Sequence, residues 1–331
     1  MRTKVNSKDE PKLSAIATPG ILLSRSRADG VELGGIFYMS CNKQIHFYSK
    51  LIRNRPQIMP SLIRRRLGEA MSIPPSGVAV SSFGNVRFPV DMSIHSIARK
   101  YYFHTHEMFL EDIFRTYLMP GRIFIDVGAN LGYWSAFAAS LVGREGEVHA
   151  FEPVPRFFES VSQLAAENPE YKIVANNQAC GSVPGTVTMQ VVTPTKENYH
   201  NFETNIGSSS ALPHFLDHDR HLVSEVEAAV VRLDDYIAER GIDIARIGLI
   251  KIDVEGYESY CFGGMPSILG KKGAKVPLLC EILTDKKRHE LLDGSQIVQR
   301  LERDGYKIFD ATTLRPMDLN KLSFEENVLG V

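Results

Sequence analysis

The sequence predicts an α/β fold in which a mostly parallel sheet is covered by helices on both faces. From residue 122 onwards, apolar segments typical of strands alternate with segments of helical periodicity. Strand–helix alternation is typical of parallel sheets, and strands buried on both faces have continuous apolar runs such as RIFIDV and LIKI. The length of 331 residues allows one large domain with an extension.

The composition is that of an ordinary globular protein, with 44% hydrophobic residues, 23% charged residues and a formal net charge of −1. Such a balance does not predict a phosphate-tracking surface, so nucleic acid is not an expected partner. The apolar runs are far shorter than the roughly 20 residues that span a bilayer, and the polar N-terminus lacks a signal-peptide core. Four cysteines stand far apart, so we expect free thiols in a reducing cytoplasm and neither a zinc site nor a disulfide framework.

The N-terminal third has weaker patterns than the rest of the chain. We expect residues 1–15 to be disordered and residues 16–100 to form a cap on a catalytic domain at 101–331. Within the cap, a helix is predicted at 61–71 and two strands within 78–92. A further helix is predicted at residues 107–118, where Pro120 and Gly121 end it.

The alternating region contains the elements of the predicted sheet. Strands are predicted at residues 122–128, 147–153, 171–179, 246–256, 277–283, 306–311 and 326–331. Helices are predicted at residues 131–143, 155–168, 233–241 and 295–305. An inserted pair of strands is expected at 186–192 and 228–233. The connection at 193–225 has no regular pattern, and loops of that length are often lids or binding loops.

The first predicted strand ends at an acid and is followed by a glycine-containing turn. The strand ends at Asp126, and Gly128, Asn130 and Gly132 follow. No Lys–Ser/Thr pair follows, so the turn is not a phosphate loop. It also differs from a dinucleotide turn, because Asn130 replaces the middle glycine that lets a pyrophosphate approach. A carboxylate at Asp126 fits a cationic ligand group better than a phosphate.

The second predicted strand ends at Glu152, twenty residues after Gly132. An acid in this position can accept two hydrogen bonds from a ribose diol. The turn and the two acids therefore suit an ammonium group and a ribose without a phosphate, a combination found in S-adenosylmethionine. Taken singly, the glycines are also explained as turn residues, and Glu152 as a solvated strand end.

Three segments occur in the order FIDVGANLGYW, HAFEPVPRFFE and LIKIDVEGYE. Over roughly residues 83–285 the chain resembles the FkbM family of S-adenosylmethionine-dependent methyltransferases. The resemblance implies the class I methyltransferase (Rossmann-like) fold, with a seven-stranded sheet whose last strand is antiparallel. It also implies methyl transfer, usually to a hydroxyl oxygen of a natural product, a sugar or a lipid-linked glycan.

The resemblance implies cofactor contacts when it is carried over position by position. The residues implied at the methionine end are Asp126, Gly128, Asn130 and Gly132. Glu152 is implied at the ribose, and Gln178 and Ala179 near the adenine. The match is weaker at the adenine, because no acid follows Gly181 as it often does in relatives.

The segment IKIDVEGYE is expected to supply the chemical end of the site. The two-residue period of a strand places Lys251, Asp253 and Glu255 on one face. As candidate catalytic residues we assign Asp253, Glu255 and Glu281, which would accept the proton of an acceptor hydroxyl or orient it. Alternatively, Asp253 or Glu255 contacts the sulfonium end of the cofactor or a divalent ion, or Glu255 caps the next helix. For Lys251 we expect a structural ion pair.

Other polar clusters have weaker interpretations. The spacing of His214, His218 and His221 allows a metal site, but a solvated loop is the simpler explanation and no metal is assigned. The run Ser208–Ser210 supplies a hydroxyl to the site or acts as a hinge. Glu107 either contacts the cofactor or caps the helix that follows it.

The sequence thus predicts an S-adenosylmethionine-dependent O-methyltransferase with a small-molecule or glycan acceptor, whose cap takes part in a homodimer or in substrate binding. Three alternatives remain. Asn130 argues against a nicotinamide-dependent oxidoreductase. The acids Asp253, Glu255 and Glu281 argue against a non-catalytic cofactor-binding protein, and the near-neutral charge argues against an RNA 2′-O-methyltransferase.

Overall fold

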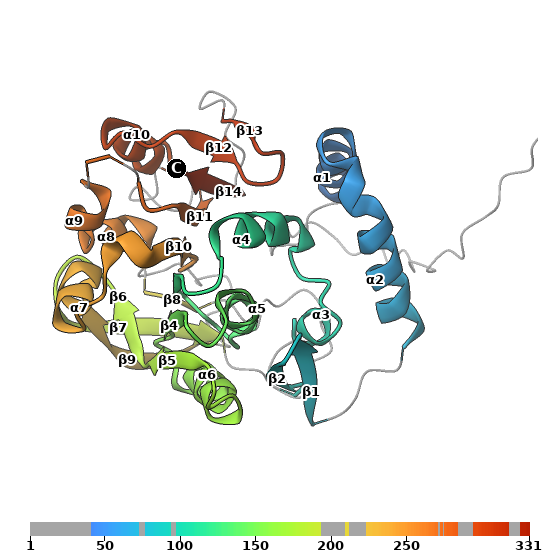
Figure 1. The fold of residues 1–331 in the computed structure, drawn as a ribbon, viewed down its shortest axis with the longest axis horizontal. Helices are drawn as coiled ribbons and strands as arrows, with labels where there is room; N and C mark the ends of the chain where they lie inside the picture. Colours follow the sequence, from blue (N-terminus) through green and yellow to red (C-terminus); the bar gives the residue numbers. More distant parts are fainter. Residues whose placement is uncertain are drawn as a thin grey trace, which may run out of the picture. The chain divides into compact units, whose positions relative to one another are not determined.

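The apolar runs from residue 123 onwards form an eight-stranded sheet with the order β13-β12-β14-β11-β10-β3-β4-β5 (Figure 1). Its strands are β3 (Ile123–Val127), β4 (Glu147–Phe151), β5 (Lys172–Asn176), β10 (Ile247–Ile252), β11 (Leu278–Leu283), β12 (Ile308–Asp310), β13 (Arg315–Pro316) and β14 (Glu325–Gly330). The strands from β5 to β11 are parallel, and β14 runs antiparallel between β11 and β12. This arrangement confirms the predicted α/β fold, to which the two-residue strand β13 adds an eighth, edge strand.

The computed structural model describes residues 41–72, 77–93, 97–192, 209–211, 223–270, 272–273, 275–283, 294–317 and 325–331. All of them lie in one unit, Ile36–Val331. The segment expected to be disordered, residues 1–15, lies outside the described residues, as does most of the predicted loop at 193–225. In the described part of the chain, no helix is long and apolar enough to cross a membrane.

Helices cover both faces of the sheet because successive strand residues point to opposite faces. In β3, Phe124 packs on one side with α4 (Glu111–Tyr117), α5 (Tyr133–Val142) and α6 (Pro155–Glu167). On the other side, Ile123 and Ile125 pack with α7 (Leu233–Glu239), α8 (Glu258–Gly263), α9 (Pro266–Leu269) and α10 (Gly294–Arg303). All residues of β3 and β10 are buried, as the continuous apolar runs predicted.

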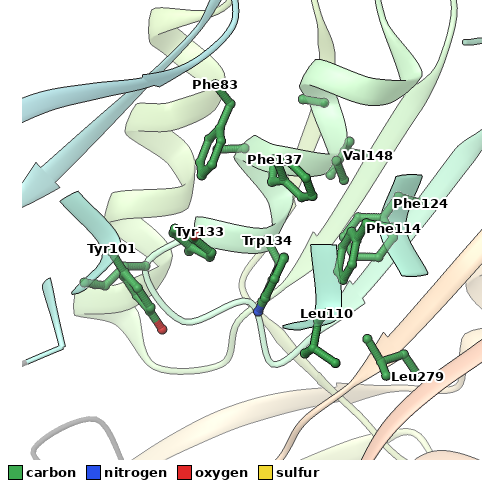
Figure 2. Packing of buried hydrophobic residues seen from close by; sticks show 14 of the residues in the cluster. Phe83, Tyr101, Leu110, Phe114, Phe124, Tyr133, Trp134, Phe137, Val148 and Leu279 are labelled. Atoms are coloured by element: carbon green, nitrogen blue, oxygen red, sulfur yellow. The ribbon is translucent and has the colours of Figure 1, made fainter. Parts of the chain in front are cut away.

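The N-terminal elements pack into the same hydrophobic core as α5, on one face of the sheet. They are α1 (Cys41–Asn54), η1 (Pro56–Ile58), α2 (Met59–Met71), β1 (Val78–Phe83), β2 (Val86–Asp91), α3 (Ala98–Tyr102) and η2 (Met108–Leu110). Strands β1 and β2 form the predicted hairpin around Gly84. Phe83 from this hairpin packs against Tyr133 and Phe137 of α5, with ring centroids 5.2 and 5.3 Å apart (Figure 2).

The structure also contains a second, four-stranded sheet, in which two strands have other bounds than predicted. It has the order β6-β9-β7-β8, formed by β6 (Gln178–Cys180), β7 (Gly185–Val192), β8 (Ser209–Ser210) and β9 (Val223–Val231). The strand predicted at 171–179 is in fact two strands, because β5 pairs with β4 whereas β6 pairs with β9. The strand predicted at 228–233 begins earlier and ends at Val231, since Leu233 already belongs to α7.

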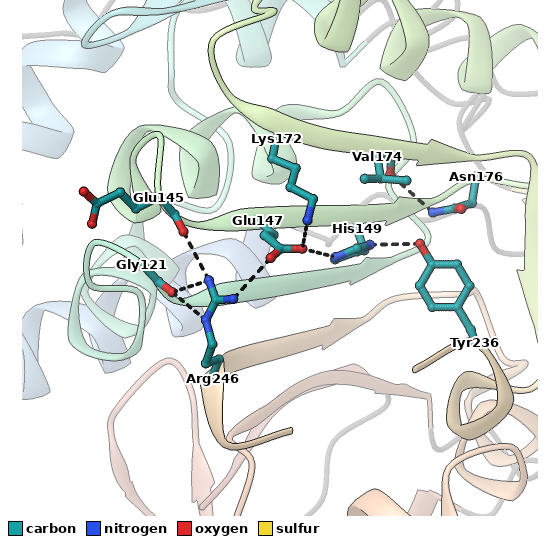
Figure 3. Close-up of polar contacts among 9 residues, drawn as sticks. All are labelled: Gly121, Glu145, Glu147, His149, Lys172, Val174, Asn176, Tyr236 and Arg246. Carbon is teal, nitrogen blue, oxygen red and sulfur yellow. Dashed lines mark hydrogen bonds and ion pairs between the residues drawn. The ribbon is translucent and has the colours of Figure 1, made fainter. Parts of the chain in front are cut away.

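A polar network ties the strands together at the amino ends of the parallel sheet (Figure 3). Glu147 accepts from Lys172 Nζ at 2.7 Å and lies 3.3 Å from Arg246 of η4 (Ile244–Arg246). His149 lies 3.3 Å from Glu147 through Nε2 and 2.8 Å from the hydroxyl of Tyr236 on α7 through Nδ1. Since this end is occupied by structural contacts, a ligand site is expected at the opposite, carboxyl edge.

Candidate active site

The carboxyl ends of β3, β4 and β10 border a cavity of about 320 Å³. Its wall contains most of the residues that the sequence predicted for the site: Gly128, Asn130, Glu152, Gln178, Ala179, Asp253, Glu255 and Glu281. These residues come from five separate segments of the chain, and the parallel strands bring them to one edge of the sheet. Asp126 and Gly132 are absent from the described part of the wall.

The turn after β3 presents its backbone to the cavity. Gly128 has φ +84°, and a Cβ at this position would lie 1.8 Å from the carbonyl oxygen of Asp253, so no other residue fits here without a shift. The amides of Gly128 and Ala129 both donate to the carbonyl of Phe151 at 3.0 Å. Asn130 has φ +51°, a conformation that asparagine tolerates better than most residues. The turn is therefore tightly packed against Asp253 and Phe151, and Gly128 contributes only backbone to the cavity wall.

Asp126 and Gly132 lie behind that wall and position α5. Asp126 is buried, and its Oδ2 accepts a hydrogen bond of 2.7 Å from the hydroxyl of Ser135. Burial raises the pKa of Asp126, although Lys251 and Ser135 oppose the change. Gly132 is the N-cap of α5 with φ +84°, and a Cβ there would lie 3.2 Å from Leu164. The direct cofactor contact implied for these two residues stays a prediction.

Glu152 is held in place by backbone amides. Its Oε2 accepts from the N–H of Asn130 at 2.8 Å, and its Oε1 accepts from the N–H of Val154 at 2.9 Å. The side chain is buried, and burial raises its pKa to about 7 despite these hydrogen bonds. A carboxylate oxygen has two acceptor sites, so both oxygens can still accept a hydrogen bond from a ligand diol.

Lys251 and Asp253 form an ion pair at the end of β10. Lys251 Nζ lies 2.7 Å from Asp253 Oδ2, and the side chains are 6% and 30% exposed respectively. Burial acts to raise the pKa of Asp253, but Lys251, a hydrogen bond to Glu281 and His106 lower it below its usual value. Burial acts to lower the pKa of Lys251, yet Asp253, Asp126 and Glu107 raise it. The pair is therefore charged at neutral pH, and Lys251 has the structural partner that the sequence predicted.

Glu255 lies in a turn rather than on the strand, because β10 ends at Ile252. It has φ +51°, and its carbonyl accepts a hydrogen bond of 2.8 Å from Ser210. The helix-capping contacts that we considered for Glu255 are made by Glu258, whose Oε1 accepts from the amides of Val254 and Gly256 at 3.4 and 3.0 Å. Glu255 itself lines the cavity, with Ser209 from β8.

The opposite wall is aromatic and was largely missed by the sequence interpretation. It contains Tyr101, His106, Glu107, Tyr133 and Trp134. His106 Nε2 lies 3.1 Å from Glu107 Oε2. Burial acts to raise the pKa of Glu107, but His106 and Lys251 lower it. Tyr133 and Trp134 were assigned only to the predicted helix at 131–143. Their hydroxyl and indole N–H groups, placed directly after the glycine turn, could have indicated a role in the site.

Several predicted residues lie outside the described part of the chain. They are His214, His218, His221 and Ser208. Among the residues that the structure does describe, no group of three or more histidine, cysteine, aspartate or glutamate side chains has the arrangement of a metal site.

Comparisons with known proteins identify a methyltransferase family. The family model described as Methyltransferase FkbM domain matches residues 126–308, more than half of the chain. The 31-O-demethyl-FK506 methyltransferase FkbM of Streptomyces tacrolimicus is 34% identical over 164 residues, which is 45% of this chain and 61% of that protein. The chain thus spans less than two thirds of this curated relative's length.

The solved structures that match have low sequence identity and TM-scores below 0.5. Methyltransferase FkbM from Methylobacillus flagellatus KT is 12% identical with a TM-score of 0.38, over 71% of this chain and 54% of that one. A putative rRNA-methylase from Clostridium thermocellum is 12% identical with a TM-score of 0.38, over 66% of this chain and 91% of that one.

Proposed function

Because the chain belongs to the Methyltransferase FkbM domain family, we propose that it transfers a methyl group from S-adenosylmethionine to a hydroxyl oxygen of a natural product or carbohydrate. The observation that carries the proposal is the pairing of the Gly128 turn with the buried carboxylate of Glu152 at one edge of the sheet. The curated relative is named for an O-demethyl acceptor, which supports oxygen as the atom methylated here.

The residues of the cavity fit this cofactor. When bound, S-adenosylmethionine supplies a methyl group activated by a sulfonium cation. Glu152 would accept hydrogen bonds from the ribose hydroxyls, and Gln178 and Ala179 line the wall where the adenine is expected. The carboxylates of Glu107 and Asp253 would attract the ammonium and the sulfonium, because both groups are cationic. Gly128 lines the same cavity and would lie near the methionine end.

Asp253 and Glu281 are the proposed groups at the acceptor hydroxyl. A hydroxyl oxygen must lose its proton as its new bond to carbon forms, and a positioned carboxylate can accept that hydrogen bond and proton. Asp253 remains ionised through its pair with Lys251, so it accepts rather than donates a hydrogen bond. Glu281 contacts Asp253 and lines the same cavity, which allows the two carboxyl groups to share the proton.

Asp253→Asn tests this assignment in a methyl-transfer assay. S-adenosylmethionine with a labelled methyl group is incubated with sugar and macrolide alcohols and with matched amines. We expect transfer to an alcohol by the wild type and a loss of turnover of about a hundredfold or more in Asp253→Asn. The affinity of the variant for S-adenosylhomocysteine should change much less than its turnover.

Asp235→Asn is the matched control, because Asp235 is 43% exposed and pairs with Arg232 on α7, away from the cavity lining. Its turnover should equal that of the wild type. Full turnover by Asp253→Asn would rule out the proposed role of Asp253, and methylation of the amines alone would contradict an oxygen acceptor.

A further inference from the structure

Trp134 lines the cavity, and its indole carries a hydrogen-bond donor that has no acceptor among the described residues. Trp134 lines the cavity and is 4% exposed. Its Nε1 is buried, and none of the described residues accepts a hydrogen bond from it. Figure 2 shows this nitrogen pointing away from Phe83 and Phe137, on the side toward which the hydroxyl of Tyr101 also points.

The ring is fixed in this orientation by aromatic packing. It stacks on Phe114 with a centroid distance of 4.4 Å and an interplanar angle of 19°. Tyr133 and Phe137 contact it edge-on, at 5.1 and 5.8 Å. Because a buried donor without an acceptor is unfavourable, and this one cannot rotate to find one, the missing acceptor is expected on a ligand.

The charges of the cavity indicate which ligand group this donor meets. Glu107 and Asp253 line the wall and would repel an anion. Lys251 is already paired with Asp253 at 2.7 Å, His106 lies 3.1 Å from Glu107, and among the described lining residues there is no arginine. A ligand carboxylate in this cavity therefore needs neutral donors, and an indole N–H is a donor only.

The position of Trp134 in the chain points to the amino-acid end of the cofactor. Trp134 is the second residue of α5, which begins directly after the glycine turn. The first amides of a helix have no partner within the helix and favour negative charge. Asp126 already accepts a hydrogen bond from one of these amides, that of Ser135, so the indole N–H adds a donor beyond the backbone of the helix.

We propose that the indole N–H of Trp134 donates a hydrogen bond to the carboxylate of the cofactor's methionine moiety, while Asp253 attracts its ammonium. This inference rests on the proposed function. It assigns the two charged groups of the amino-acid moiety to different residues of the cavity wall.

Two ligands and one conservative variant test the proposal by calorimetry. S-adenosylhomocysteine has the amino-acid carboxylate, and 5′-methylthioadenosine lacks it but keeps the adenosine. In Trp134→Phe, which retains an aromatic ring against Phe114, the affinity for S-adenosylhomocysteine should fall about ten- to a hundredfold, as for the loss of a hydrogen bond to a charged group. The affinity for 5′-methylthioadenosine should remain within about twofold of the wild-type value.

Phe114→Leu is the control for packing, because it removes the stacking partner and keeps the indole N–H. It should affect both ligands alike. Since Trp134 is the single tryptophan of the chain, its fluorescence in the wild type also reports binding. We expect S-adenosylhomocysteine to change the emission more than 5′-methylthioadenosine does.

The outcomes separate this inference from the proposed function. If the wild type binds S-adenosylhomocysteine and Trp134→Phe binds it equally well, the carboxylate contact is wrong and the proposed function stands. Equal losses for both ligands would show that Trp134 acts through packing, which also overturns the contact. If the wild type binds neither ligand, the proposed function fails and the inference fails with it.

Discussion

Glu152 is oriented independently of any ligand, since the amides of Asn130 and Val154 each donate to one of its carboxylate oxygens. This dual anchoring explains how a buried acid is kept at the carboxyl edge of β4. The same two hydrogen bonds do not fully offset burial, which raises the pKa of Glu152 to about 7. A group with such a pKa changes its charge near neutral pH.

Glu152 gives the cofactor affinity a predicted pH dependence. Ribose hydroxyls donate hydrogen bonds, so they bind the ionised carboxylate better than the protonated form, and ionisation increases as the pH rises through about 7. The affinity for S-adenosylhomocysteine should therefore increase roughly tenfold from about pH 6 to about pH 8 and then level off. Calorimetric titrations across this range measure it.

Glu152→Gln is the matched variant for this titration, because it keeps the shape and removes the ionisation. Its affinity should be lower at alkaline pH and nearly independent of pH. A wild-type affinity that stays constant, or that falls as the pH rises, would show that Glu152 does not accept the ribose hydroxyls in its ionised form.

Among individual residues, the backbone constraints of the site were easier to predict than side-chain directions. Gly128 was predicted because a turn that approaches a ligand closely needs glycine, and the structure adds a second steric reason, since a Cβ there would collide with the carbonyl of Asp253. Asp126 was expected to face the ligand; its carboxylate contacts Ser135 of α5, a partner that the sequence did not indicate, and the ligand contact stays a prediction. Strand periodicity gives the face of a residue, whereas its partner depends on where the following helix begins.

At the scale of elements, α5 is anchored at its start by the bond between Ser135 and Asp126, which are both fully or almost fully buried. We predict that Ser135→Ala lowers the free energy of unfolding by about 1–3 kcal/mol, because the buried carboxylate of Asp126 would lose a hydrogen-bond donor. Urea denaturation measures this change. Cofactor affinity should fall with it, since the glycine turn leads directly into α5.

Ser140→Ala is the control within the same helix. The hydroxyl of Ser140 donates to the carbonyl of Phe137, three residues earlier, and Ser140 is only partly buried. Its removal should change stability by less than about 0.5 kcal/mol. Equal effects of the two substitutions would argue against Asp126 and Ser135 as the anchor of α5.

Elements with a clear local sequence pattern were predicted well. Elements whose bounds depend on pairing with residues far away in the sequence were not. The continuous apolar runs of β3 and β10 identified these strands directly. The division between β5 and β6 depends on the pairing of Gln178 with Ala229, about fifty residues away, which local sequence does not show. The aromatic wall escaped prediction for the same reason, because Tyr101 and Trp134 meet only through tertiary packing.

At the scale of the whole molecule, the N-terminal helices are joined to the sheet domain by a buried arginine. Arg55, between α1 and η1, is 2% exposed and donates to the carbonyl of Phe109 at 2.6 Å. It also pairs with Asp112 on α4 at 2.5 Å, and nearby Lys50 pairs with Asp310 of β12 at 2.7 Å. The cap that we predicted at residues 16–100 therefore has, in its described part, polar contacts with two regions of the sheet domain.

We predict that Arg55→Met lowers the stability of the entire described unit by about 2–4 kcal/mol, because it leaves buried carbonyls without a donor. Thermal unfolding followed by circular dichroism should show one transition at a lower temperature. Arg53→Met, at an exposed position of α1, should melt as the wild type does. A separate early transition in Arg55→Met would instead indicate that the N-terminal helices unfold independently of the sheet.

Calorimetric titration with S-adenosylhomocysteine and with NAD is the most direct test of the central claim, that the cavity binds a methyl donor. The wild type should bind S-adenosylhomocysteine at one site per chain and should not bind NAD, and Glu152→Ala should weaken the binding while the protein remains folded. Binding of NAD without binding of S-adenosylhomocysteine would contradict the account and favour a nicotinamide-dependent enzyme on the same sheet.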